Sequence, residues 1–222
     1  MKKSLEALKL YAKTALHPAV VIMAVFFMVI MLVLLVFDPE EYASEEYLDM
    51  IGSVQIGHIG IYFLIFAGGS RVSQNKFFAS SKFAKTLYTT TPVMFIFLIT
   101  LAYDAVIAAI SAAVADTRTL SDFLVFDSLS SAAVIIGGAT YGKKKLGIVF
   151  ALPYFLFLTF PMTAEKIGFN DNSLGLSLPA AFAAAAGIYI LSIVFSVIIT
   201  RTWWKTGDKF YLQSNYIRKT MS

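Results

Sequence analysis

The chain has 222 residues, of which 58% are hydrophobic and only 14% are charged. A soluble domain averages about 45–50% apolar and about 25% charged residues, so this composition excludes an ordinary water-soluble protein. The absence of cysteine excludes disulfides and thiolate metal sites, and the formal charge of +4 fits membrane orientation better than nucleic-acid binding.

Six apolar stretches predict membrane-spanning helices, because a hydrocarbon core of about 30 Å needs about 20 helical residues. They cover residues 18–37, 50–68, 93–115, 123–141, 146–161 and 179–200. The fourth and fifth stretches are joined by only residues 142–145. The remaining segments are too short to build a soluble core. We therefore expect one all-α integral membrane domain over residues 1–222.

The basic residues predict the orientation of these helices. In chain order, the seven segments outside the spans hold 4, 0, 4, 1, 3, 1 and 5 Lys or Arg residues. If all six stretches cross the membrane, the four rich segments lie on one side. Because cytoplasmic loops carry the excess of Lys and Arg, both termini are expected in the cytoplasm, including the tail 201–222. Trp203 and Trp204 follow the last span, where interfacial aromatic anchors are common.

Residues 1–17 predict an amphipathic helix that lies in the membrane surface. Its lysines point away from an apolar face, as expected for a helix in the headgroup region. His17 and Pro18 should end this helix and turn the chain into the first span. The apolar face consists of Leu5, Leu8, Ala12 and Ala15.

Residues 75–91, between the second and third spans, predict a second cytoplasmic helix, ended by Pro92. Its aromatic residues need lipid or a protein groove to cover them. The apolar positions at helical spacing are Phe77, Ala84 and Tyr88 on one side, with Phe83 and Leu87 beside them; Lys76, Lys82 and Lys85 supply charge.

A few polar residues within the spans are candidate functional groups. A carboxylate such as Asp104 is costly in a membrane and usually faces the interior of the bundle. It is either a substrate-path or proton-relay group, or a hydrogen-bond acceptor for Tyr103, Gln55 or a serine of the fourth span. Gln55 and His58 share one helix face and predict an interhelical polar contact. Asp127, near the outer end of the fourth span, either reaches the interface or has a functional role.

Catalytic, nucleotide and metal sites are not expected in this chain. Residues 137–144 approach a phosphate-binding loop, but Lys144 stands where that loop needs Ser or Thr, and a membrane span replaces the preceding strand. The spans contain one histidine and no cysteine, which disfavours a metal site. Glycines in the second span and small residues in the fourth span predict close helix packing.

The layout of an interfacial helix, six spans and a helical basic loop after the second span resembles the membrane subunit of ABC-2 type exporters. It is similar to small six-helix permeases of bacterial peptide exporters, such as those for bacteriocins or phenol-soluble modulins. The resemblance covers the whole chain, and residues 75–91 look like the coupling helix of that family.

This resemblance implies a permease in the bacterial plasma membrane that exports an amphipathic peptide or other hydrophobic substrate. It implies a separate cytoplasmic subunit that binds ATP and Mg²⁺, a second permease copy or sister permease, and no nucleic acid. The residues implied at the ATPase are Lys76, Phe77, Phe78, Lys82, Phe83 and Lys85, and the candidate substrate path is Gln55, His58 and Asp104.

Three alternatives remain open from the sequence. A proton-coupled secondary transporter would use Asp104 and His58, although six helices without an internal repeat are uncommon in that class. A non-transporting immunity or accessory protein would have the same topology. An intramembrane enzyme would need more polar residues than the spans contain.

Overall fold

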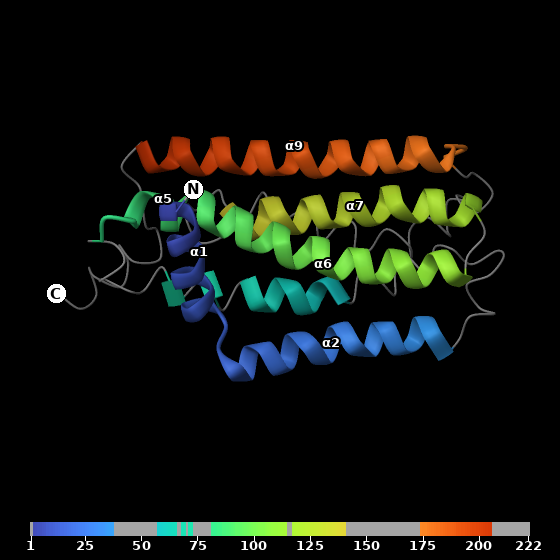
Figure 1. Ribbon diagram of the computed structural model, residues 1–222, viewed down its shortest axis with the longest axis horizontal. Helices are drawn as coiled ribbons and strands as arrows, with labels where there is room; N and C mark the ends of the chain where they lie inside the picture. The colour runs from blue at the N-terminus through green and yellow to red at the C-terminus, as the bar shows by residue number, and fades with distance from the viewer. Residues whose placement is uncertain are drawn as a thin grey trace.

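The computed structural model describes residues 2–37, 57–65, 68–69, 71–72, 81–114, 117–140 and 174–205. Every regular element in these ranges is a helix, which confirms the all-α prediction for the described part (Figure 1). The helices are α1 (Lys2–Ala15), α2 (Pro18–Phe37), α5 (Ala84–Tyr88), α6 (Thr90–Val114), α7 (Thr117–Thr140) and α9 (Leu178–Lys205), and residues 57–65 are also helical.

Three of the described helices are long and apolar enough to cross a membrane: Thr90–Ala113, Thr117–Thr140 and Leu178–Lys205. The pair formed by α1 and α2 passes the same test as one bent unit, which raises the number to as many as four. Several apolar helices of this length are typical of a membrane protein. The predicted second span lies partly, and the predicted fifth span entirely, outside the described residues.

The observed helices differ from the predicted spans mainly at their ends. The helix α2 has the predicted bounds, but α7 begins at Thr117 instead of residue 123, and α9 continues to Lys205. Hydropathy excludes polar terminal residues, whereas a helix continues while its backbone hydrogen bonds are satisfied. Pro92 does not end the loop helix; it lies in the first turn of α6, where proline is tolerated because the first N–H groups have no helical partner.

The helix α7 forms the centre of the bundle, with α6 and α9 packed against it (Figure 1). Within their apolar windows, 78% of α7 is buried, compared with 39% of α6 and 17% of α9. The main apolar core joins α7 to α6 and to residues 57–65 through side chains such as Phe123, Ile96 and Ile61. The outward face of α9 therefore meets the surroundings of the bundle, which for a spanning helix is lipid.

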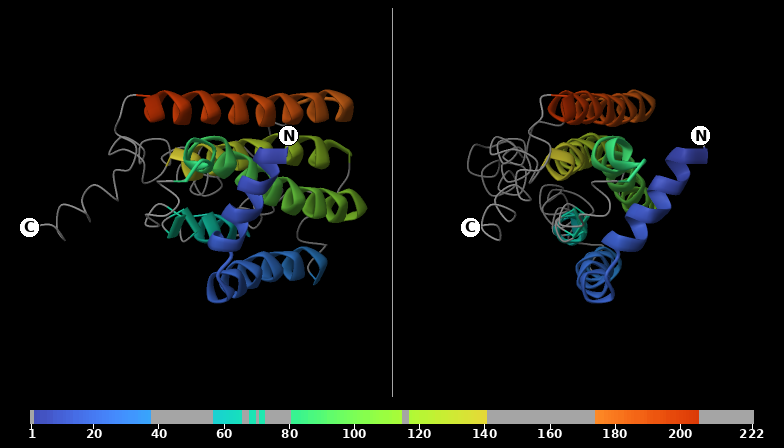
Figure 2. Two further views of the ribbon diagram at one scale, coloured as in Figure 1. Left: turned by 60° about the vertical axis from the view of Figure 1, so that its left-hand side comes forward. Right: turned by 90° about the vertical axis from the view of Figure 1, so that its left-hand side faces the viewer.

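The helix α1 lies across one end of the bundle, as Figure 2 shows, at 88° to the start of α2. The turn occurs at His17 and Pro18, as predicted. One face of α1 packs against the protein through Ala7, Tyr11 and Ala15, whereas Leu5 is 55% exposed. The apolar surface of α1 is thus divided, with one stripe inside the protein and part of the predicted face outside it.

Glycines allow close approaches between helices, as the sequence predicts. A Cβ at Gly60 would lie 2.6 Å from the backbone oxygen of Ala24 in α2, and a Cβ at Gly138 would lie 2.6 Å from the Ile65 side chain. Side chains larger than hydrogen would push these helices apart, so glycine determines the spacing around residues 57–65.

Candidate functional site

Five polar side chains from four segments meet inside the bundle. We call them the His58 cluster: His58 from residues 57–65, Asp104 from α6, Asp127 and Ser131 from α7, and Tyr189 from α9. His58 and Ser131 are fully buried, and Asp104 and Asp127 are each 5% exposed. These four side chains are therefore shielded from the surroundings of the bundle, whereas Tyr189 is partly buried.

The hydrogen bonds of the cluster converge on Asp104 and on one nitrogen of His58. His58 Nε2 lies 3.0 Å from Asp104 Oδ1 and 2.9 Å from Ser131 Oγ. Asp104 Oδ2 accepts hydrogen bonds from the Ser131 hydroxyl, at 2.6 Å, and from the Tyr189 hydroxyl. Asp127 Oδ1 lies 3.8 Å from His58 Nε2.

Helix geometry places these groups at one depth. With a rise of about 1.5 Å per residue, Asp104 lies about 21 Å from the start of α6 and about 15 Å from its end. Asp127 and Ser131 are four residues apart on α7 and so lie on the same face. Tyr189 is about 17 Å along α9. The cluster therefore lies well inside the apolar part of the bundle.

Gly57 makes room for an aromatic wall of the cluster. The Tyr103 ring packs edge-on against the His58 ring, with centroids 5.4 Å apart and an interplanar angle of 87°. A Cβ at position 57 would overlap the Tyr103 hydroxyl. Glycine at this position thus allows Tyr103 to cover the imidazole.

The cluster contains more acidic than basic groups. Two carboxylates face one imidazole, and an uncompensated charge is very costly away from water. The excess negative charge must be balanced by protons or by a bound cation. His58, Asp104 and Asp127 each offer a ligand atom, and these atoms lie within 4.8 Å of one another. The numbers of His and Cys residues in the sequence gave no reason to expect such a group.

The structure brings together some of the predicted site residues. The hydrogen bond from a fourth-span serine to Asp104 is confirmed, with Ser131 as the donor, and His58 makes the predicted interhelical contact. Gln55 lies outside the described residues. The expectation that Asp127 reaches the interface is wrong, because α7 begins at Thr117 and Asp127 is buried about 15 Å along it.

Tyr189 was missed by the sequence reasoning. A tyrosine hydroxyl in a long run of Ala, Ile, Leu and Val needs a partner in a membrane, and that was the available signal. Its partner, Asp104, is 85 residues earlier in the chain. Only the packing of α9 beside α6 and α7 identifies this pair.

The residues implied at the ATPase are described only in part. Lys82 and Lys85 are exposed, and Phe83 is partly buried against the cluster that contains Leu87 and Phe95. The Lys82 ammonium lies 5.1 Å from the centroid of the Phe83 ring. The helix in this region, α5, spans only Ala84–Tyr88. The other three, Lys76, Phe77 and Phe78, lie outside the described residues.

The short helix α5 is joined to its neighbours by specific contacts. The Tyr88 hydroxyl donates to the Val72 carbonyl at 2.9 Å, and the Tyr88 ring stacks on Trp204 of α9 with centroids 6.2 Å apart. The Thr200 hydroxyl of α9 donates to the Thr89 carbonyl at 3.3 Å. We use the name α5 end for the part of the bundle that consists of α1, α5, Val72 and the last turns of α9 with Thr200 and Trp204.

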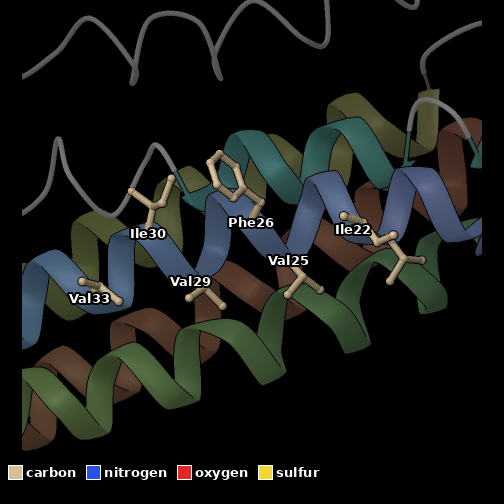
Figure 3. A pocket seen from close by; sticks show the side chains of 7 residues that line it. Ile22, Val25, Phe26, Val29, Ile30 and Val33 are labelled. Atoms are coloured by element: carbon tan, nitrogen blue, oxygen red, sulfur yellow. The ribbon is translucent and has the colours of Figure 1, made fainter.

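An apolar groove runs along the outward side of α2 (Figure 3). Ile22 and Phe26 in this groove are 68% and 57% exposed. The groove is lined by Val21, Ile22, Val25, Phe26, Val29, Ile30 and Val33. A surface of this kind is covered by lipid or by another apolar helix in a membrane.

No family model matches the chain, and no curated protein or solved structure matches it either.

Proposed function

We propose that this chain is the membrane-spanning permease subunit of an ATP-driven ABC-2 type exporter in the bacterial plasma membrane. The main support is the construction of the α5 end. There α1 lies across the bundle, and α5 contacts α9 and Val72. A cytoplasmic motor that moved α5 would move several segments at once.

Helix directions support six spans in this proposal. The Leu174 N–H donates to Asp122 Oδ1 at 3.1 Å, so the start of α9 lies beside the first turns of α7. Further along, Tyr189 lies beside the Ser131 region. The two helices therefore run in the same direction. Parallel neighbours require an odd number of crossings between them, as the expected fifth span would provide.

The charges of the described residues support cytoplasmic termini. Exposed Lys9, Lys13, Lys82 and Lys85 lie on α1 or beside and within α5, whereas Arg118 is at the opposite end, at the start of α7. The excess of basic residues at the α5 end is the pattern of a cytoplasmic surface.

The contacts suggest how a push on α5 reaches the centre of the bundle. Tyr88 links α5 to Val72, seven residues beyond the segment that carries His58. The same ring stacks on Trp204 in α9, the helix that carries Tyr189. Tyr88 therefore joins α5 to two segments that carry members of the His58 cluster, the one that contains His58 and the helix α9. A rigid-body movement of α5 would alter the spacing of these helices around the cluster.

A second permease subunit completes the proposal. One bundle of this size is too small to enclose a wide path, and the exposed groove of α2 offers an apolar surface for a second copy or a sister permease. The substrate proposed for such a pair is an amphipathic peptide or another hydrophobic molecule.

Purification in mild detergent from native membranes tests the proposal. We expect an ATP-binding protein to co-elute in near-equal amount. Replacing Lys82 and Lys85 with Glu should release it, because both side chains are exposed beside α5. The matched control is Arg118→Glu, which reverses an exposed charge at the opposite end and should retain the partner. A folded chain that elutes without any ATP-binding protein would refute the proposal.

A further inference from the structure

We propose that His58, Asp104 and Asp127 bind one divalent cation, of the kind held by imidazole and carboxylate ligands, inside the bundle. The probe of this class is Zn²⁺. The proposal goes beyond the permease function and does not depend on it, since it concerns three side chains of this chain alone.

The spacing of the ligand atoms fits such an ion. Zinc binds His nitrogen and carboxylate oxygen at about 2.0–2.2 Å, so neighbouring ligands of a tetrahedral site are about 3.3–3.5 Å apart. His58 Nε2 lies 3.0 Å from Asp104 Oδ1 and 3.8 Å from Asp127 Oδ1, and these distances bracket that spacing. All three ligand atoms are within 4.8 Å of one another, so small side-chain shifts would complete the triangle.

Asp127 provides an independent observation. Its side chain is 4% exposed, and its Oδ1 atom has no hydrogen-bond partner among the described residues. That atom faces His58 Nε2 at 3.8 Å, beyond hydrogen-bond distance. A buried carboxylate oxygen without a partner is costly, and a cation between it and the imidazole would supply the missing interaction.

The charges of the three groups balance a divalent ion. Two ionised carboxylates and a neutral imidazole carry a formal charge of −2, which an M²⁺ ion neutralises. In an apolar interior this arrangement avoids the large cost of isolated buried charges. Protons alone could also balance the cluster, and the experiment below separates that outcome from metal binding.

Outer hydrogen bonds orient the Asp104 ligand. The hydroxyls of Ser131 and Tyr189 both donate to Asp104 Oδ2, which leaves Oδ1 facing His58. Partners of this kind commonly fix carboxylate ligands in metal sites. The donor set contains nitrogen and oxygen without thiolate, which suits Zn²⁺ or Mn²⁺ better than soft monovalent copper.

The test is a metal-binding measurement on the full-length chain in detergent. After chelator treatment and gel filtration, the protein is titrated with Zn²⁺, and bound zinc is measured by calorimetry and by elemental analysis. We expect one zinc per chain, and at least about a 10-fold weaker affinity in Asp127→Asn. The matched control is Asp122→Asn, which changes a buried aspartate of the same helix whose carboxylate accepts the Leu174 N–H instead.

Thermal unfolding gives a second measurement. It shows whether each variant is folded, and it reports metal binding as a rise in melting temperature. At one zinc concentration, Zn²⁺ should raise the melting temperature of the wild-type chain and of Asp122→Asn more than that of Asp127→Asn. A folded wild-type chain that binds neither Zn²⁺ nor Mn²⁺ would overturn the proposal and leave a cluster balanced by protons. Zinc binding that Asp127→Asn leaves unchanged would also overturn it, because the metal would then be elsewhere, such as on the acidic residues of segment 38–49.

Discussion

Replacing Ser131 with Ala should destabilise the bundle by about 1–2 kcal/mol. Its hydroxyl lies 2.6 Å from Asp104 Oδ2 and 2.9 Å from His58 Nε2, and it links α7 to two other segments. Hydrogen bonds to charged groups contribute about 1.5–3 kcal/mol in soluble proteins, but interhelical bonds in membranes average about 0.6 and reach about 1.7 kcal/mol. Asp104 keeps the Tyr189 hydroxyl as a donor, so the full cost of an unpaired group does not arise.

Ser111→Ala in α6 is the control for this prediction. Ser111 is also buried, at 2% exposed, but its hydroxyl has no hydrogen-bond partner among the described residues. The two substitutions remove the same atom and change helix propensity equally, so these contributions cancel in the difference. Ser111→Ala should be neutral or stabilise the chain by up to about 1 kcal/mol, because it removes a buried polar group without a partner.

The free energies of unfolding can be compared in mixed micelles with increasing fractions of denaturing detergent, followed by circular dichroism. We expect Ser131→Ala to be less stable than Ser111→Ala by about 1–3 kcal/mol. Equal stability of the two variants, or a larger loss for Ser111→Ala, would show that the Ser131 hydroxyl does not hold the cluster together.

Two further predictions concern helix spacing and the α5 end. Gly60→Ala should destabilise the chain by about 1–3 kcal/mol, because its Cβ would meet the Ala24 carbonyl at 2.6 Å; Gly187→Ala, with nothing within 4 Å, should be neutral or slightly stabilising when both are unfolded in the same micelles. Burial raises the pKa of Tyr88 to about 12, above its ordinary value of 10, so stability should fall as the pH rises from 10 through 12. In a phenolate absorbance titration, Tyr88→Phe should remove a component in this range; a Tyr88 that titrates near pH 10 would contradict its burial.

Among the helices that the structure describes, the sequence was sufficient to place α2, α6 and α9, because their apolar runs and boundary residues are local. Pro18 marks the start of α2 since proline fits the first helical position, and the predicted bounds match the observed ones. The predicted start of α7 was wrong. The low hydropathy of Ser121 and Asp122 placed them in a loop, whereas both are buried within the helix. Polar residues that point into a bundle lower hydropathy without ending the helix.

Of the contacts in the His58 cluster, the sequence could predict those of Asp104, because a carboxylate inside a membrane requires a hydrogen-bond donor. A carboxylate in the middle of α6 must find a donor, so a fourth-span serine near Asp104 could be expected, and Ser131 is that donor. The meeting of Asp127 with His58 depends on the rotation of α7 about its axis. The sequence pattern of α7 does not determine that rotation, because small and polar residues occur around much of its surface.

The order of the helices along the chain decides when each polar group of the cluster finds its partners during synthesis. The helix α7 carries Asp127 near its middle, and an aspartate near the centre of a lone helix costs about 2.5–3.5 kcal/mol on insertion. During synthesis α7 is therefore stabilised by α6, which is already present and supplies apolar contacts. Tyr189 is made last, so Asp104 gains its second hydroxyl donor only after α9 has inserted. A chain that stops before residue 178 would lack the Tyr189 hydroxyl, so Asp104 would keep only its contacts with Ser131 and His58.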